Sequence, residues 1–197
     1  MINNKLFTII LCGDSASGKD TIQHYLIENF RFSKIVTYTT RLPREIETQD
    51  LDYHFITNEE FELLIKQDFF AEYDEYSQKR FYGSAKCDYL NGNKVIILTP
   101  NGVENIKKTI NSQNVFIVYI KTPLGTRIKR YIDRIGVDKF SFDDKNEICS
   151  RVERDFGMFL GIENKVDLVV NGDKDIKEIA EEIINKIKEK INDCTKR

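Results

Sequence analysis

The chain has 197 residues, of which 41% are hydrophobic and 31% are charged, a balance typical of a folded globular protein. This length suits one domain with a sizeable core and leaves room for an inserted subdomain. Thirty basic residues nearly cancel thirty-two acidic ones, and the net charge of -2 excludes bulk attraction to nucleic acid or to an anionic membrane. Any recognition of anionic groups must therefore come from local clusters of basic residues.

The N-terminal segment begins with an apolar strand pattern. Residues 5–12 are apolar and partly β-branched up to Gly13, which predicts a buried strand. Residues 21–27 follow with helical spacing of apolar side chains. Residues 34–38 predict a second strand, and a polar loop continues from there to Gln49.

The next segment changes character and predicts a small, partly antiparallel subdomain inserted into the main fold. Residues 52–56 suit a short strand. Asn58 is expected to cap a helix that continues through Lys66. Residues 69–76 are aromatic and alternating, which predicts another strand.

The remaining chain alternates between strand and helix patterns. We expect strands over 94–98, 115–120 and 166–170, and helices over 103–110, 124–135, about 146–160 and 173–191. This alternation predicts a parallel sheet covered by helices on both faces. Ligands of such sheets bind at the carboxyl ends of the strands, where we expect Gly13, Thr39, Thr99, Lys121 and Asn171.

The cysteines and the apolar segments indicate the cellular compartment in which the protein is expected. The four cysteines show no metal-ligand spacing, and we expect a reducing cytoplasm rather than a disulfide framework. The longest apolar run, 6–12, is too short for a bilayer, and the N-terminus lacks the apolar stretch of a signal peptide. We expect a cytoplasmic monomer or homodimer, with neither nucleic acid nor membrane as a partner.

A glycine-rich segment follows the first predicted strand and reads Gly13-Asp14-Ser15-Ala16-Ser17-Gly18-Lys19-Asp20-Thr21. Gly13-x-x-x-x-Gly18-Lys19 matches the phosphate-binding loop, in which backbone N–H groups surround phosphate oxygens. The helix after the loop adds its positive N-terminus, and Lys19 reaches the outer phosphates as a point charge. These nine residues are therefore our candidate ATP site, with Lys19 a catalytic candidate.

One position departs from the loop pattern. The residue after the lysine is usually Ser or Thr, whose hydroxyl binds Mg²⁺, but here it is Asp20. A carboxylate also suits Mg²⁺, directly or through water, because this ion prefers oxygen ligands. We expect Asp20 to help hold Mg²⁺ and Thr21 to contact the phosphates.

Further motifs follow the loop in a fixed order. They are Thr37-Tyr38-Thr39-Thr40-Arg41-Leu42-Pro43-Arg44, Asp52-Tyr53-His54-Phe55, Phe69-Phe70-Ala71-Glu72 and Phe81-Tyr82-Gly83-Ser84. Together with the loop, they resemble the guanylate kinase family from Leu6 to about Gly92. The segment Val169-Val170-Asn171-Gly172-Asp173 is similar to the family's last strand and loop.

This resemblance implies an α/β P-loop NTPase fold with a parallel sheet covered by helices, an inserted small β-rich subdomain that binds a nucleoside monophosphate, and a helical lid. We expect a single domain over 1–197. Its core would comprise 1–36 and 93–197, its acceptor-binding subdomain about 37–92 and its lid about 130–155.

The acceptor site is expected around two arginines. Arg41 and Arg44 stand three residues apart at a strand end, where both guanidinium groups can fork onto a dianionic phosphate. Tyr53 and Tyr82 can add hydroxyl donors. The resemblance implies that all four bind the acceptor phosphate.

Base recognition is implied by four further positions. Glu72 matches the family's glutamate, whose carboxylate accepts from guanine N1–H and the exocyclic amine. Thr37 and Ser84 match a serine and a Ser or Thr near the base. Thr99 stands where the family has a base-reading Asp, and this departure leaves open an acceptor other than a guanine nucleotide.

The lid is expected to carry arginines that neutralise charge on the moving phosphoryl group. By resemblance, Arg134 and Arg151 are the catalytic candidates, whereas Lys129 and Arg154 are expected on a solvated helix face. Asn171 matches the residue that contacts the adenine ring of ATP.

The predicted function is phosphoryl transfer from ATP, with Mg²⁺, to GMP or dGMP, so the expected partners are small-molecule nucleotides. One alternative is a kinase of the same fold with another nucleotide or phosphorylated acceptor. A less favoured alternative is a non-catalytic guanylate-kinase-like domain that binds proteins, since such domains lose the phosphate loop that this chain keeps.

Overall fold

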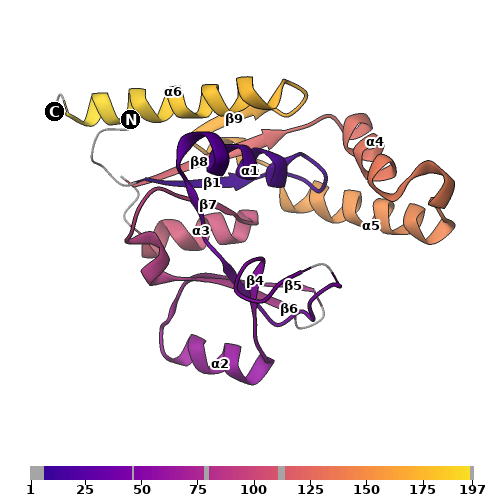
Figure 1. The fold of residues 1–197 in the computed structure, drawn as a ribbon, viewed down its shortest axis with the longest axis horizontal. Helices are drawn as coiled ribbons and strands as arrows, with labels where there is room; N and C mark the ends of the chain where they lie inside the picture. Colours follow the sequence, from indigo (N-terminus) through magenta and orange to yellow (C-terminus); the bar gives the residue numbers. More distant parts are fainter. Residues whose placement is uncertain (1–6, 46, 78–79, 111–113, 196–197) are drawn as a thin grey trace.

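The computed structural model describes residues 7–45, 47–77, 80–110 and 114–195. Figure 1 shows two sheets, one in the upper half of the view and a smaller one below it, with α4 and α5 projecting to one side. Lys5 and Leu6, which the first predicted strand includes, lie outside the described residues. Among the described helices, none combines the length and the apolarity needed to cross a membrane.

The larger sheet is parallel and has the order β2-β7-β1-β8-β9. Its strands are β1 (Thr8–Cys12), β2 (Ser33–Lys34), β7 (Lys94–Ile97), β8 (Val115–Lys121) and β9 (Leu168–Asn171). All five residues of β1 are buried, as the unbroken apolar pattern of a central parallel strand predicts.

Helices cover both faces of this sheet, which confirms the predicted α/β class. The covering helices are α1 (Lys19–Phe30) and α6 (Ile176–Thr195) on one face and α3 (Pro100–Thr109) on the other. Helices α4 (Leu124–Ile135) and α5 (Phe142–Met158) project to one side, and short 3₁₀ turns lie at Lys86–Tyr89, Val137–Lys139 and Ile162–Lys165. On one face, Leu11 packs with Leu26 of α1 and Ile183 of α6. On the other, Ile10 packs with Val103 and Ile106 of α3.

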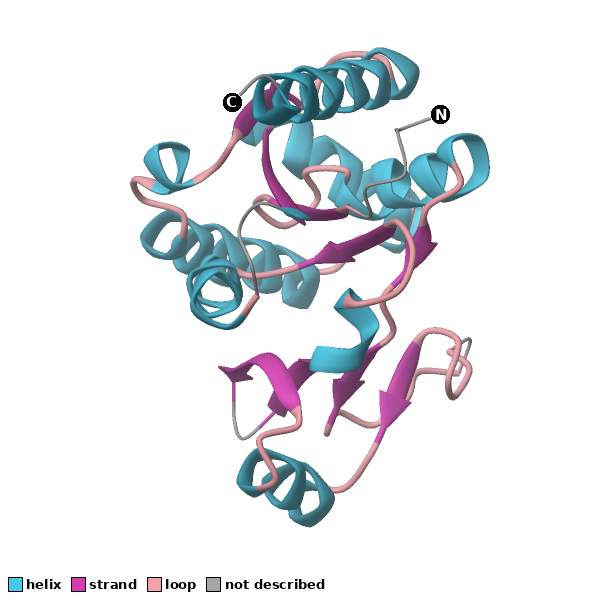
Figure 2. Ribbon diagram, turned by 90° about the vertical axis from the view of Figure 1, so that its left-hand side faces the viewer, coloured by secondary structure: helices cyan, strands magenta, loops and turns pink. Residues whose placement is uncertain are grey.

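The smaller sheet has the order β4-β3-β6-β5. Its strands are β3 (Thr37–Thr39), β4 (Tyr53–Phe55), β5 (Phe70–Ser77) and β6 (Arg80–Ala85), and α2 (Asn58–Lys66) lies below them in Figure 2. Strands β3 and β4 are parallel, and the other pairs are antiparallel. Phe61 of α2 stacks on Phe70 with ring centroids 4.5 Å apart, so α2 and its aromatic contacts cover one face of this sheet.

Three sequence expectations need correction here. The single strand expected over 34–38 is two strands, because β2 pairs with β7 in the larger sheet whereas β3 pairs with β4 and β6 in the smaller one. Thr39 therefore lies in the smaller sheet, where its hydroxyl donates to the Phe81 carbonyl. Thr57, not Asn58, caps α2, since its side chain accepts from the Glu60 N–H in a reciprocal capping box.

The two sheets are joined through α3, which packs along β5. The Thr109 hydroxyl donates to the Ala71 carbonyl at 2.5 Å, and the Asn105 amide donates to the Tyr73 carbonyl at 3.4 Å. Because α3 begins right after β7, this packing brings the carboxyl end of a central strand next to the inner face of the smaller sheet.

Candidate active site

The loop between β1 and α1 has the conformation of an anion-binding nest. A Cβ atom on Gly13 would lie 2.6 Å from Ser17 Oγ, so this position accepts only glycine. Ala16 and Gly18 have φ values of 61° and 101°, in the left-handed region. Such alternation turns successive backbone N–H groups toward one point, and the N-terminus of α1 adds to the positive potential there.

The Lys19 ammonium lies inside this loop. Its Nζ donates to the carbonyls of Gly13 and Asp14 at 2.7 and 2.8 Å. Burial lowers the pKa of Lys19, and the carboxylates of Asp20 and Asp155 are the strongest of the groups that oppose this shift. A bound phosphate would oppose it further, because a nearby negative charge favours the ammonium.

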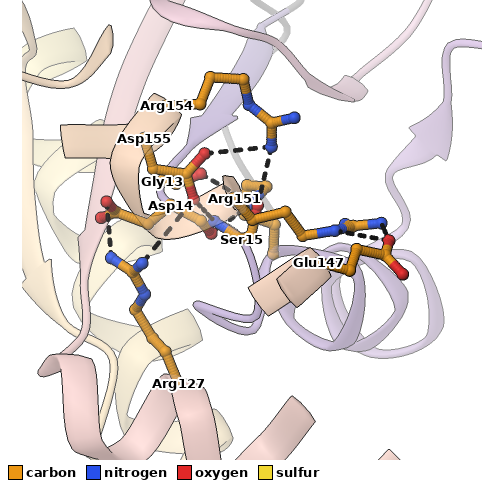
Figure 3. A network of polar contacts seen from close by, with 9 residues as sticks. Gly13, Asp14, Ser15, Arg127, Glu147, Arg151, Arg154 and Asp155 are labelled. Carbon is orange, nitrogen blue, oxygen red and sulfur yellow. Dashed lines mark hydrogen bonds and ion pairs between the residues drawn. The ribbon is translucent and has the colours of Figure 1, made fainter. Parts of the chain in front are cut away.

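A buried ionic network connects the loop to β8, α4 and α5 (Figure 3). Arg127 of α4 bonds Asp14 Oδ1 at 2.7 Å and reaches Asp155 Oδ2 at 3.8 Å. The Tyr119 hydroxyl donates to Asp14 Oδ2 at 3.0 Å. The Asp14 side chain therefore fixes the loop to β8 and α4. The part of Asp14 in binding ATP stays a prediction.

Helix α5 contacts the loop directly through Asp155 and Arg154 (Figure 3). The Ser15 N–H donates to Asp155 Oδ2 at 2.6 Å, and Arg154 lies 3.3 Å from the other carboxylate oxygen. The expectation of a solvated face is therefore wrong for Arg154, because Asp155 and Ser15 draw it toward the loop. A phosphate that uses the Ser15 amide must displace the Asp155 carboxylate.

Glu47 binds both acceptor-site arginines, Arg41 through its guanidinium and Arg44 through its backbone N–H. Arg41 forms a forked pair with Glu47, with distances of 2.8 and 2.9 Å, and Glu47 also accepts from the Arg44 N–H at 2.8 Å. The hydrogen bonds from Arg41 hold the pKa of Glu47 below its ordinary value. The guanidinium of Arg41 lies over the Tyr53 ring, 5.3 Å from its centroid, and the Tyr82 ring lies 6.1 Å from that of Tyr53.

The Glu72 carboxylate sits in the wall between the two sheets and is only 5% exposed. Ser84 donates to Glu72 Oε1 at 2.7 Å and also bonds the Tyr89 hydroxyl at 2.7 Å. Ser84 itself is fully buried and supports the glutamate, and its expected contact with a base stays a prediction. Burial raises the pKa of Glu72 to about 7.

The raised pKa of Glu72 predicts a pH-dependent stability. The folded state keeps the proton up to about pH 7, whereas the unfolded state releases it near 4.5. The proton on Glu72 therefore stabilises the folded state fully below about pH 4.5. This stabilisation is lost as the pH rises through about 7, which lowers the free energy of unfolding by on the order of 3 kcal/mol. Urea unfolding at about pH 5 and about pH 8 should show most of this loss in the wild type and not in Glu72→Gln. Equal losses in both proteins would contradict the assignment.

Thr99 holds a second carboxylate in the same wall. It caps α3, where its Oγ1 accepts from the Gly102 N–H at 3.1 Å and donates to Asp74 Oδ2 at 2.8 Å. Asp74 received no role from the sequence motifs. The alternation of strand residues was the available signal, because Asp74 shares a face of β5 with Glu72.

One cleft of about 490 Å³ lies between the larger sheet, the smaller sheet and α5, and many of these groups border it. Its lining includes, from the predicted site, Gly13, Ser15, Lys19, Thr37, Arg41, Arg44, Tyr53, Glu72, Tyr82, Thr99 and Arg151. It also includes Asp74, Arg80, Glu147, Arg154 and Asp155, which the sequence motifs left out. This volume is in the usual range for a small-molecule site.

Nine predicted site residues do not line this cleft: Asp14, Ala16, Ser17, Gly18, Asp20, Thr21, Ser84, Arg134 and Asn171. The Arg134 guanidinium lies over the Tyr131 ring, 4.8 Å from its centroid. Asn171 is exposed at the end of β9, where its side chain accepts from the Asp173 N–H at 3.0 Å. Asp20 is exposed in the first turn of α1, next to Lys19. Their roles stay predictions.

A phosphate-binding loop and a second cationic site that share one cleft define a P-loop nucleoside monophosphate kinase. A sequence model described as guanylate kinase matches residues 5–192. The chain belongs to the guanylate kinase family.

Individual relatives agree with this assignment. The chain is 27% identical over 195 residues to the guanylate kinase of Malacoplasma penetrans, covering 96% of each chain. It is 29% identical over 189 residues to that of Salinibacter ruber, covering 92% of this chain and 95% of the relative. The crystal structure of guanylate kinase from Anaplasma phagocytophilum aligns over 93% of this chain and 85% of its own, with a TM-score of 0.66 and 21% identity, which supports the fold.

Proposed function

We propose that this protein transfers the γ-phosphoryl group of ATP to GMP or dGMP, yielding ADP and GDP or dGDP. One observation carries the proposal: a single cleft is lined by Lys19 of the phosphate loop, by Arg41 and Arg44, and by the Glu72 carboxylate. In this proposal Lys19 binds the triphosphate and the two arginines bind the acceptor phosphate. The Glu72 carboxylate accepts hydrogen bonds from a base that has adjacent N–H donors. The cysteine pattern favours the cytoplasm as its location.

In the proposed reaction, an oxygen of the acceptor phosphate attacks the γ-phosphorus as the bond to the bridging β–γ oxygen breaks. ADP leaves with that oxygen. No general base is needed, because the acceptor is already an anion. Lys19 neutralises charge on the outer phosphates, Arg151 does so from α5, and Arg134 joins when the lid closes. Asn171 contacts the adenine ring in this proposal.

Mg²⁺ supplies further charge neutralisation when it is bound with ATP. Asp20 fits a role in holding it, because its carboxylate is exposed in the first turn of α1 and oxygen is the donor that Mg²⁺ prefers. We predict that Asp20→Ala raises the Mg²⁺ concentration for half-maximal activity by roughly 10-fold. Titration of Mg²⁺ at saturating ATP measures this, with the neighbouring exposed Glu28→Ala as the control. An unchanged midpoint for Asp20→Ala would remove it from the metal site.

The test of the function is ADP release with a panel of nucleoside and deoxynucleoside monophosphates. We expect turnover with GMP and dGMP well above that with AMP, CMP or dTMP. Turnover with another member alone would favour a kinase of the same fold with a different acceptor, the candidate that Thr99 keeps open. No turnover with any member would overturn the kinase proposal and favour a binding domain.

A further inference from the structure

Strand β5 presents two carboxylates to the cleft. Glu72 and Asp74 lie two residues apart, so both point to the same side of the strand. Their partners across the pair with β6 are Ser84 and Tyr82, and both carboxylates border the cleft. The opposite side of the strand packs on α2, where the Phe61 and Tyr73 rings are in contact. The wall that faces a bound base is therefore doubly acidic.

The Thr99 hydroxyl donates its hydrogen bond to one of these carboxylates, that of Asp74. A threonine hydroxyl has one proton to donate, and Thr99 donates it to Asp74 Oδ2 at 2.8 Å. Its oxygen accepts from the Gly102 N–H. The Thr99 hydroxyl after β7 thus positions a neighbouring carboxylate, and Asp74 supplies the carboxylate in this part of the cleft wall.

Glu72 and Asp74 each use one carboxylate oxygen in a hydrogen bond with a neighbouring hydroxyl and have a second oxygen beside it. Glu72 Oε1 accepts from Ser84, and Asp74 Oδ2 accepts from Thr99. Glu72 Oε2 lies 3.1 Å from the position a Cβ on Gly102 would take, so a larger residue there would crowd the carboxylate. Two acceptors thus stand side by side in the cleft wall.

We propose that Asp74 is a second base-reading residue, which accepts a hydrogen bond from the exocyclic 2-amino group of guanine while Thr99 positions it. This inference rests on the proposed function. Guanine offers three N–H bonds on its pairing edge, one on N1 and two on the amine. A single carboxylate forks onto two of them, and Asp74 takes the third.

The same wall disfavours other purines. Adenine presents an acceptor, N1, where guanine has a donor, and an acceptor facing two carboxylates is repelled. Hypoxanthine keeps N1–H and lacks the 2-amino group, so inosine monophosphate reports on that group alone. Asp74 therefore predicts discrimination between GMP and IMP, whereas a residue that only supports the fold predicts none.

The experiment measures GMP and IMP binding by calorimetry, without ATP, for the wild type, Asp74→Ala, Asp74→Asn and Glu75→Ala. Glu75 is the matched control, because it lies on the same strand with its side chain on the opposite face. We expect Asp74→Ala to raise the Kd of GMP roughly 10- to 100-fold and that of IMP less than about threefold. Asp74→Asn keeps the shape of the side chain and should also weaken the preference for GMP over IMP.

A double variant that moves the carboxylate from position 74 to position 99 completes the test. In Asp74→Ala/Thr99→Asp the carboxylate comes from the end of β7 instead of from β5, and we expect most of the GMP preference to return. Equal losses for GMP and IMP in both Asp74 variants, or no loss, would overturn the inference. If the wild type binds and phosphorylates GMP in that case, the proposed function stands and only Asp74 is excluded. If the wild type neither binds nor phosphorylates GMP, the proposed function itself fails.

Discussion

Replacing Lys19 with methionine should lower kcat about 100- to 1,000-fold, the cost of removing one charge that stabilises a phosphoryl-transfer transition state. The ammonium already lies within the phosphate loop, bonded to the carbonyls of Gly13 and Asp14. Methionine keeps the length of the stem and removes only the charge and its donors. ADP release at saturating ATP and GMP measures the effect.

Lys129→Met is the matched control, because Lys129 is an exposed lysine on α4 that does not border the cleft. It should leave kcat within about twofold of the wild type. Thermal unfolding of both variants separates lost chemistry from lost structure. Residual activity of Lys19→Met close to that of the wild type would show that Lys19 is dispensable, or that a contaminating kinase produces the signal.

Much of the site was predictable because its determinants are local in sequence. The loop from Gly13 to Lys19 needs only a strand, two glycines and a helix start, and each of these has its own sequence pattern. The same holds for Arg41 and Arg44, which one short loop carries. Helix α4 was also predicted with its observed bounds, Leu124–Ile135, since its apolar spacing is regular and Gly136 ends it.

The remaining site depends on packing between distant segments. Asp155 reaches the Ser15 amide across 140 residues of chain, and no spacing rule links these positions. Asp14 carried a signal, since a carboxylate buried beside an apolar strand needs a cationic partner, but nothing in the sequence singled out Arg127 among the arginines of its helix. The break between β2 and β3 was hidden for a related reason. Strand propensity continues through Val36, and only the change of pairing partner separates the two strands.

Replacing Arg41 with alanine should raise the KM for GMP by about 100-fold, because two charge-assisted hydrogen bonds to the acceptor phosphate are lost. The guanidinium is only partly exposed and is held by Glu47 and the Tyr53 ring, so little conformational freedom remains to be lost on binding. The KM for ATP should change by less than about threefold, since the loop at Lys19 is untouched. Steady-state kinetics with each substrate varied in turn measures both values, and Lys66→Ala, an exposed cation of α2, is the control.

The Arg41–Glu47 pair allows a sharper distinction. If Arg41 served only to order the loop through Glu47, then Glu47→Ala and Arg41→Ala would raise the KM for GMP equally, because either change breaks the same forked pair. If Arg41 binds the phosphate, Glu47→Ala leaves the cation in the cleft and removes the carboxylate with which the phosphate competes. Its KM should then stay within about 10-fold of the wild type while that of Arg41→Ala rises further. Arg41→Lys should fall between them, because it keeps the charge and loses the fork.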